Sequence, residues 1–248
     1  MPAKTLQKNP GRYQVGTFIK TNSPHVVEVL GTSALDFGVL DAEHAPLDRA
    51  GLDLMMMASR AGGLPLLVRI PDKNPATILS VLDMGAAGLL VPHVDSVADA
   101  EAVVAHAKFR GGQRGFSGSP RFAGYGTLGM KQALTAGDQA MIICQIEGPE
   151  AVAAAADIAA VPGVDGLFIG RADLALAMGI EDSKHPDVAA AADRSIAAAL
   201  AAGKIAGVFT ASIAERDAYA AKGVNWFVFG SDQSLMRQAA DASAHPSP

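Results

Sequence analysis

Short, continuously apolar runs recur along this chain, and each is followed by a segment with the spacing of a helix. A run that is apolar at successive positions is what a strand needs when both of its faces are buried, as in a parallel sheet covered by helices. The segments between the runs have apolar residues three and four apart, which predicts helices with one buried face. The predicted strands are residues 15–20, 36–40, 65–70, 88–91, 141–146, 165–169, 205–209 and 226–229.

This alternation predicts an α/β protein folded as a single (β/α)8 TIM barrel. The length of 248 residues is close to the ~250 that is typical of such a barrel. An open, doubly wound sheet is the alternative, but no Gly-x-Gly-x-x-Gly motif follows the first predicted strand. We expect one barrel domain over residues 1–248, with an N-terminal arm at 1–13 and a disordered tail at 241–248.

One segment breaks the alternation. Residues 110–138 are rich in glycine, serine and arginine and show little periodicity before Leu128. A connection of this length inside a compact domain usually carries function or an additional helix. We therefore expect this segment to carry either a functional role or an additional helix.

Composition and charge limit the partners of the protein. The formal net charge is −5 and no long basic run is present, which argues against nucleic acid. Residues 1–13 lack the apolar stretch of a signal peptide, and no apolar run approaches the ~20 residues of a membrane span. The single cysteine, Cys144, is expected to be a buried, inert thiol. We expect a cytoplasmic protein with neither nucleic-acid nor membrane partners.

Polar side chains stand at the ends of four predicted strands. In a TIM barrel the active site lies at the carboxyl ends of the strands, so these residues are the candidates for function. They include carboxylates, a histidine and guanidinium groups, which is the set that metal-assisted enolate chemistry requires. The candidates are Asp41, Glu43 and His44 after the second strand, Arg69 in the third, Gln145 and Glu147 at the fifth, and Arg171 and Asp173 after the sixth.

Glu147 and Asp173 are the candidate ligands of a divalent cation. Two carboxylates supply hard oxygen ligands for Mg²⁺ or Mn²⁺ and leave positions open for water and for a 2-oxo acid such as pyruvate. Arg69 carries a permanent positive charge that can stabilise the enolate oxygen. His44 is the candidate base, because an imidazole titrates near neutral pH, and Asp41 can fix its tautomer.

Each candidate also has a structural interpretation. Glu147 can be an exposed loop carboxylate, and Asp173 can cap the helix that follows it. Arg69 can be paired structurally with the carboxylates after the second strand, because a buried arginine needs an acidic partner. His44 can be a loop histidine with local partners, and His93, beside a strand end, is expected to be structural or solvated.

Motifs over nearly the whole chain are similar to those of one known family. They are LDF at 35–37, DAEHAP at 41–46, VRIP at 68–71, LDMGA at 82–86, RG and SGSPR within 114–121, QIE at 145–147, GVDGLFIG and ADL within 163–174, and FGSD at 229–232. In these segments the chain resembles the HpcH/HpaI aldolase/citrate lyase family. The resemblance is to its class II, metal-dependent pyruvate aldolases, such as the 2,4-dihydroxyhept-2-ene-1,7-dioate and 2-dehydro-3-deoxyglucarate aldolases.

The resemblance implies roles for individual residues. Glu147 and Asp173 match the family's metal ligands, and the implied cofactor is Mg²⁺, Mn²⁺ or Co²⁺. Arg69 matches the arginine that contacts the keto oxygen of pyruvate, and His44 with Asp41 matches the catalytic dyad.

Further substrate-binding positions are implied in the same way. Gln145 matches a polar residue beside the substrate. Ser119 and the backbone from Gly170 to Ala172 match positions that receive the pyruvate carboxylate, and Asp173, matched to a metal ligand, is also counted among the substrate-binding residues. Backbone amides are suitable for this purpose, because their N–H groups bind anions.

The chain departs from the family at Arg171, where the family usually has proline. An arginine there adds a cation that can select an acidic aldehyde, or it can contact a neighbouring subunit. Phe18 and Phe209 fall at strand ends where the family places aldehyde-pocket residues, with core packing as the alternative.

The resemblance also implies a homo-hexamer, a dimer of trimers in which the last helix packs on a neighbour. Ser231 and Asp232 are expected to cap that helix, which is predicted to end at Ala240. Leu235 and Met236 offer it an apolar surface.

The predicted function is a metal-dependent aldolase that reversibly cleaves a 4-hydroxy-2-oxo acid to pyruvate and an aldehyde through a metal-bound pyruvate enolate. The main alternative is a CoA-ester lyase or condensing enzyme of the citrate lyase or malyl-CoA lyase type. A Schiff-base aldolase would need a buried lysine on a strand, and Lys20 is its one candidate. A non-catalytic barrel that serves as a scaffold is a further alternative, against which the complete candidate set argues.

Overall fold

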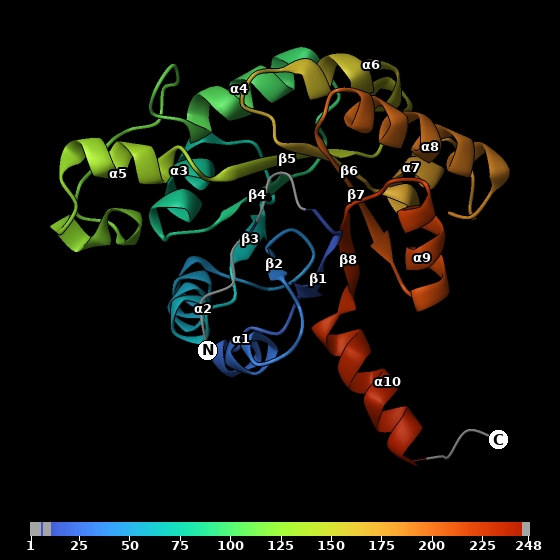
Figure 1. The fold of residues 1–248 in the computed structure, drawn as a ribbon, viewed down its shortest axis with the longest axis horizontal. Coiled ribbons are helices and arrows are strands. Elements are labelled where there is room, and N and C mark those ends of the chain that lie inside the picture. Colours follow the sequence, from blue (N-terminus) through green and yellow to red (C-terminus); the bar gives the residue numbers. More distant parts are fainter. Residues whose placement is uncertain (1–5, 7–10, 245–248) are drawn as a thin grey trace.

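The computed structural model describes residues 6 and 11–244. Eight parallel strands, each paired with the next along the chain, close into a barrel when β8 pairs with β1. The predicted closed barrel is therefore confirmed (Figure 1), and each predicted strand is found with its ends within two residues. The strands are β1 Gln14–Ile19, β2 Phe37–Asp41, β3 Leu66–Arg69, β4 Gly88–Val91, β5 Met141–Ile146, β6 Gly166–Ile169, β7 Ile205–Thr210 and β8 Trp226–Ser231.

Helices surround the barrel, and their first turns carry the residues that favour helix starts. Proline opens four of them, where its missing N–H has no partner to lose. The side chains of Asp48, Ser96 and Ser212 accept backbone N–H groups at three others. The helices are α1 Pro24–Gly31, α2 Arg49–Gly62, α3 Pro75–Asp83, α4 Val97–Ala107, η1 Arg121–Gly126, α5 Met130–Gly137, α6 Pro149–Ala160, α7 Arg171–Ala177, α8 Pro186–Ala201, α9 Ile213–Ala221 and α10 Asp232–Ala244.

The interior of the barrel is filled by large side chains. Phe37 and Trp226 stack with their ring centroids 4.2 Å apart, and Phe168 meets Trp226 edge-on at 5.9 Å. Gly16 makes room for this cluster, because a Cβ at that position would lie 2.3 Å from the Phe37 ring. The barrel is therefore a packed core, and a small molecule has to bind at one of its ends.

The long segment between β4 and β5 carries the expected additional helix. Within it, η1 and α5 lie outside the ring of strands, next to α3 (Figure 1). Arg121 joins this segment to the barrel wall: its guanidinium donates to Asp53 at 2.8 Å and to the carbonyl oxygen of Met84 at 2.7 Å. Met84 precedes β4, so η1 packs at the amino ends of the strands.

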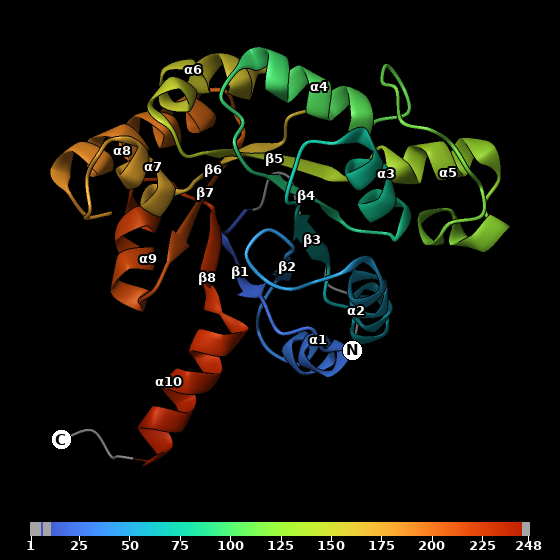
Figure 2. The same ribbon diagram turned by 180° about the vertical axis from the view of Figure 1, so that it is seen from behind.

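The last helix extends away from the barrel, as the two opposite views show (Figures 1 and 2). It continues to Ala244, so the prediction that it ends at Ala240 and that a disordered tail begins at 241 was wrong for four residues. The rest of that tail, 245–248, lies outside the described residues, as do 1–5 and 7–10 of the predicted N-terminal arm. No helix in the described part of the chain is long and apolar enough to cross a membrane.

Candidate active site

The register of the sheet brings candidate residues from different strands together. Asp41 of β2 is the direct neighbour of Arg69 of β3, and both are the last residues of their strands. Gln145 lies near the end of β5, opposite Phe168 of β6. These side chains therefore meet at the carboxyl end of the barrel, although they are far apart in the sequence.

Asp41 and Arg69 form a buried, two-pronged ion pair. Arg69 Nε donates to Asp41 Oδ1 at 2.9 Å and its Nη2 donates to Oδ2 at 2.7 Å, while Asp41 is fully buried. Lys20 Nζ lies 3.1 Å from the same Oδ2, and Glu43 Oε2 lies 3.3 Å from Arg69 Nε. Burial acts to raise the pKa of Asp41, but the hydrogen bonds and charge of Arg69 outweigh it and hold that pKa below its usual value.

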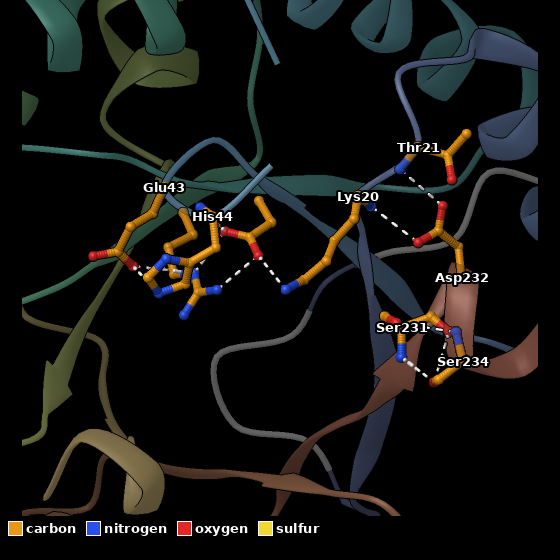
Figure 3. Close-up of polar contacts among 9 residues, drawn as sticks. Lys20, Thr21, Glu43, His44, Ser231, Asp232 and Ser234 are labelled. Carbon is orange, nitrogen blue, oxygen red and sulfur yellow. Dashed lines mark hydrogen bonds and ion pairs between the residues drawn. The ribbon is translucent and has the colours of Figure 1, made fainter. Parts of the chain in front are cut away.

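The predicted pairing of the His44 imidazole with Asp41 is not formed in this structure. Asp41 instead accepts the backbone N–H of His44, at 3.1 Å. The imidazole turns toward Glu43, with Nε2 3.6 Å from Oε2, and its side chain is 52% exposed (Figure 3). The physical reason is competition: Arg69 and Lys20 already occupy the carboxylate that was expected to orient His44.

Glu147 and Asp173 form an acidic pair on the other side of the barrel mouth. Both line one cleft, Glu147 just after β5 and Asp173 in the first turn of α7. Glu147 is 5% exposed and accepts the backbone N–H of His93 at 2.6 Å and an N–H of the Gln145 amide. Burial, with a smaller contribution from the charge of Asp173, raises the pKa of Glu147 above its usual value.

Gly170 allows β6 to approach this acidic pair closely. A Cβ at Gly170 would lie 3.1 Å from Glu147 Oε2 and 3.2 Å from Gln145 Nε2. Any larger residue would therefore have to displace the carboxylate or the amide. The glycine keeps the space in front of Glu147 open.

The oxygen atoms of Glu147, Asp173 and Gln145 form a set of donors that fits a divalent cation. The carboxylates of Glu147 and Asp173 face one cleft, a positive charge between them would relieve their repulsion, and Gln145 Oε1 is buried without a hydrogen-bond partner. Among residues 6 and 11–244, no three His, Cys, Asp or Glu side chains are grouped to hold a metal ion. The protein would thus supply two carboxylate ligands, and water and substrate oxygens would complete the shell, as is usual for Mg²⁺.

A cavity of about 550 Å³ adjoins the two pairs. Arg69, Gln145 and Asp173, from the two pairs and their neighbours, line it together with Phe209 and Glu215. Its size is within the range expected for a small-molecule site. The residues that line it include Phe18, Arg69, Gln145, Phe168, Gly170, Arg171, Ala172, Asp173, Lys184, Phe209, Ser212 and Glu215.

Comparison with known proteins identifies the family. The model of the HpcH/HpaI aldolase/citrate lyase family matches residues 14–239, which is most of the chain. The chain belongs to this family. A 5-keto-4-deoxy-D-glucarate aldolase of Shigella dysenteriae is 35% identical over 91% of this chain and 89% of its own length. A hydroxypyruvate/pyruvate aldolase of Paraburkholderia phytofirmans is 34% identical over 90% and 89%. The crystal structure of a family member from Burkholderia cenocepacia superimposes with a TM-score of 0.91 at 32% identity, covering 96% of this chain and 95% of that one.

Arg171, where this HpcH/HpaI protein departs from the expected proline, is already paired within the chain. Its Nη2 donates to Glu215 Oε1 at 2.6 Å and to the carbonyl oxygen of Phe209 at 3.1 Å. Its guanidinium also lies 5.1 Å from the centre of the Tyr219 ring. Arg171 lines the cavity, but its charge is neutralised by α9.

Both phenylalanines expected at the aldehyde pocket line the cavity, and one of them is also part of the core. Phe18 is 6% exposed and stacks under Arg69, whose Cζ lies 4.5 Å from the ring centre. Phe209 is 37% exposed, with its ring 6.2 Å from that of Phe18. Phe18 therefore packs in the core and also lines the cavity.

Ser119 is not brought to the site within one chain. Its side chain meets Ser117, with 3.0 Å between the two hydroxyl oxygens, and η1 begins two residues later. Because η1 is fixed near Met84 at the amino ends of the strands, Ser119 belongs to the opposite end from Arg69.

Sequence reasoning gave too little weight to Lys20, Glu43 and His93. Lys20 pairs with Asp41, and Glu43 contacts Arg69. His93, which was expected to be structural or solvated, has Nδ1 3.0 Å from Glu147 and Nε2 3.6 Å from Glu43. It follows β4 directly after Pro92, so its place at a strand end was the signal that could have found it.

Proposed function

We propose that this protein is a metal-dependent, class II pyruvate aldolase. It reversibly cleaves a 4-hydroxy-2-oxo acid to pyruvate and an aldehyde. The observation that carries the proposal is the pairing, at one barrel mouth, of a buried Arg69–Asp41 ion pair with the Glu147–Asp173 carboxylates. The aldolase names of the two curated relatives support the same reaction class.

Glu147 and Asp173 would hold the cation. When bound, Mg²⁺, Mn²⁺ or Co²⁺ supplies a Lewis acid that polarises the keto oxygen of the substrate. Glu147 is presented in a fixed orientation, because the amide of Gln145 and the backbone N–H of His93 both donate to it. The open space in front of Gly170 and Ala172 lies in the adjoining cavity, where we place the pyruvate carboxylate.

Arg69 stabilises the negative charge that develops on the keto oxygen during cleavage. Its guanidinium cannot lose its proton, so it remains a donor at every stage of the reaction. Two hydrogen bonds to Asp41 fix the plane of that guanidinium. A donor that is already oriented needs no reorganisation when the charge appears.

His44 takes the proton of the C4 hydroxyl as the carbon–carbon bond breaks. Its half-exposed imidazole follows β2 and lies beside Glu43, which itself contacts Arg69. Glu43 rather than Asp41 is the carboxylate that orients it in this structure. In the condensation direction His44 returns the proton to the new alkoxide.

The CoA-ester alternative requires a basic groove for phosphates, and the cations that follow α4, namely Lys108, Arg110 and Arg114, are engaged within the chain. Lys108 donates to the carbonyl oxygens of Asp138 and Ala140. Arg110 pairs with Asp138, and Arg114 is buried against Asp83. The aldolase is therefore the better supported reaction.

We further propose a homo-hexamer, a dimer of trimers. Asp232 is the one described residue of α10 that is buried, and Met236 on the same helix is 54% exposed. An apolar helix face that leaves its own barrel is suited to packing on another subunit. Ser119 can reach pyruvate only from such a neighbour.

The proposal is tested by a cleavage assay that works whichever aldehyde is the natural one. A panel of 4-hydroxy-2-oxo acids is incubated with the protein, and pyruvate release is followed by coupled reduction to lactate. We expect release with added Mn²⁺ or Mg²⁺, its loss in EDTA, and its return when metal is restored. Release that continues at full rate in EDTA would contradict the proposal.

A further inference from the structure

Lys20 reaches from the rim of the barrel to a fully buried carboxylate. It follows Ile19, the last residue of β1, and its Nζ lies 3.1 Å from Asp41 Oδ2. The Lys20 side chain is 29% exposed, whereas that of Asp41 is 0% exposed. A lysine on an ordinary surface keeps its ammonium group in water. An ammonium group that is directed to a buried carboxylate therefore indicates a specific role.

Charge balance around Arg69 depends on this lysine. Arg69 contacts two carboxylates, Asp41 and Glu43, so one guanidinium alone leaves the group with a net negative charge. Lys20 supplies the second positive charge, and its hydrogen bond contributes to keeping the pKa of Asp41 low. A net negative group would oppose the negative charge that develops beside Arg69 in the proposed reaction.

Lys20 also completes the set of donors around Asp41. Oδ1 accepts from Arg69 Nε and from the backbone N–H of His44, while Oδ2 is shared by Arg69 Nη2 and Lys20 Nζ. Without Lys20, Oδ2 would keep the Arg69 contact alone. The carboxylate would then be held by one donor fewer, and the plane of the guanidinium would be less well fixed.

The backbone of Lys20 is fixed from the other side by Asp232, the first residue of α10. Asp232 Oδ1 accepts the N–H of Lys20 and its Oδ2 accepts the N–H of Thr21, each at 3.0 Å (Figure 3). Asp232 is 2% exposed, and reciprocal hydrogen bonds between Ser231 and Ser234 hold the turn that carries it. The turn after β1 is therefore held in place, and the Lys20 side chain starts from a defined point.

We propose that Lys20 is a positioning residue of the aldolase: through Asp41 it fixes the guanidinium of Arg69 and balances the charge around it. The inference rests on the proposed function. Lys20 is not the Schiff-base nucleophile, because an attacking amine needs a free electron pair and an ammonium ion-paired with a buried carboxylate has none.

The kinetic test compares Lys20→Met, Lys20→Arg and a matched control, Lys222→Met. Lys222 also pairs with an aspartate, Asp193, but both side chains are about half exposed and the pair joins the residue after α9 to α8. We expect kcat to fall about 10- to 100-fold in Lys20→Met, less than for loss of a direct oxyanion donor, with KM within twofold. Lys20→Arg should recover most of kcat, and Lys222→Met should match the wild type.

Three kinetic results would overturn the proposal. One is a kcat of Lys20→Met within twofold of the wild type. Another is a higher KM with unchanged kcat, which would make Lys20 a substrate-binding residue. The third is a covalent adduct at Lys20 after borohydride reduction with pyruvate, which would make it a Schiff-base lysine.

A structural test is independent of catalysis, and so of whether the proposed function holds. Crystal structures of the wild type and Lys20→Met would measure the two Arg69–Asp41 hydrogen bonds directly. We expect at least one of them to be lost in the variant, and two unchanged bonds would refute the positioning role. If Lys20→Met does not fold, Lys20→Gln also removes the positive charge beside Asp41 and serves instead, with the same expected loss and the same refuting result.

Discussion

The two halves of the candidate site use the same kind of residue in opposite ways. Asp41 is a buried carboxylate surrounded by donors from Arg69, Lys20 and a backbone amide, and its pKa lies below the usual value. Glu147 is also buried, but it faces Asp173, and its pKa lies above the usual value. Within residues 6 and 11–244, no lysine or arginine pairs with either member of this acidic pair.

The difference indicates what each half needs. The arginine half has its countercharges within the protein and can orient a donor without outside help. The acidic half has a surplus of negative charge, and a divalent cation is the simplest way to neutralise it. One carboxylate thus has a structural and orienting role, while the other is available as a ligand.

The comparison is tested most strongly by Glu147→Gln. The amide keeps the shape of the side chain but removes the charge that a cation needs, so we expect at least a ~10³-fold loss of activity together with loss of tight Mn²⁺ binding. Calorimetry with Mn²⁺ and the pyruvate-release assay measure the two effects. Glu150→Gln is the control, because Glu150 lines the same cleft but is exposed at the start of α6. Equal losses of activity and Mn²⁺ binding in both variants would contradict the role of Glu147 as a metal ligand.

The other carboxylate should act on stability rather than on metal binding. We expect Asp41→Asn to lower the free energy of unfolding at neutral pH by about 3–5 kcal/mol, since it leaves the buried Arg69 without a charged partner. Mn²⁺ affinity should stay within a few-fold of the wild type. Urea denaturation at pH 7 and Mn²⁺ calorimetry make the comparison.

The pH dependence of that loss has a definite sign. Because the folded-state pKa of Asp41 is lowered, its stabilisation is present above the ordinary aspartate pKa of about 4 and disappears as the pH falls through the lowered value. The gap in stability between wild type and Asp41→Asn should therefore close as the pH falls below about 4. A gap that stays constant into strong acid would contradict this account of the pair.

Arg69→Lys keeps the positive charge and removes the two-pronged geometry. We expect kcat to fall about 10²-fold, because a lysine cannot reproduce both hydrogen bonds to Asp41 while it faces the substrate. Mn²⁺ binding should be unchanged, since Arg69 belongs to the other half of the site. Slow pyruvate release with normal Mn²⁺ binding is the expected pattern. Loss of both activity and Mn²⁺ binding would show that the two halves of the site do not act separately.

Gly170→Ala should give the smallest effect. The added methyl group would meet the Glu147 carboxylate at 3.1 Å and shift it slightly. We expect Mn²⁺ affinity to fall about tenfold, the lower end for changes that reorient a metal ligand, with the fold unchanged. Gly115→Ala is the control, because nothing lies within 4 Å of a Cβ at that position. An unchanged affinity in Gly170→Ala would show that Glu147 has room to move.

The barrel itself was predictable from the sequence, because strands buried on both faces require unbroken apolar runs. The same logic located Arg69 and Glu147, since a polar residue at the end of such a run stands at the rim. In the structure Arg69 lines the cavity at the barrel mouth, and Glu147 is hydrogen-bonded to Gln145, which lines the same cavity. The order of the strands and the burial of their faces can both be read from the pattern of apolar residues in the sequence.

Side-chain choices among close neighbours were not predictable in this way. The sequence places Asp41 near both His44 and Arg69. Which of the two side chains pairs with the buried Asp41 oxygens depends on their positions in three dimensions, and in the structure it is Arg69. Lys20 and Ser119 illustrate the same limit. The position of Lys20 was visible but its partner was not, and Ser119 lies at the other end of the barrel because of how η1 packs.

The most direct test of the central claim is hydrogen–deuterium exchange at the methyl group of pyruvate in D₂O, followed by NMR. It requires only that the two halves of the site together stabilise the enolate, and it needs no aldehyde. The account predicts exchange with Mn²⁺ or Mg²⁺ and none in EDTA, with Arg69→Lys strongly slowed in the presence of metal. Exchange that persists in EDTA, or that is as fast in Arg69→Lys as in the wild type, would contradict it.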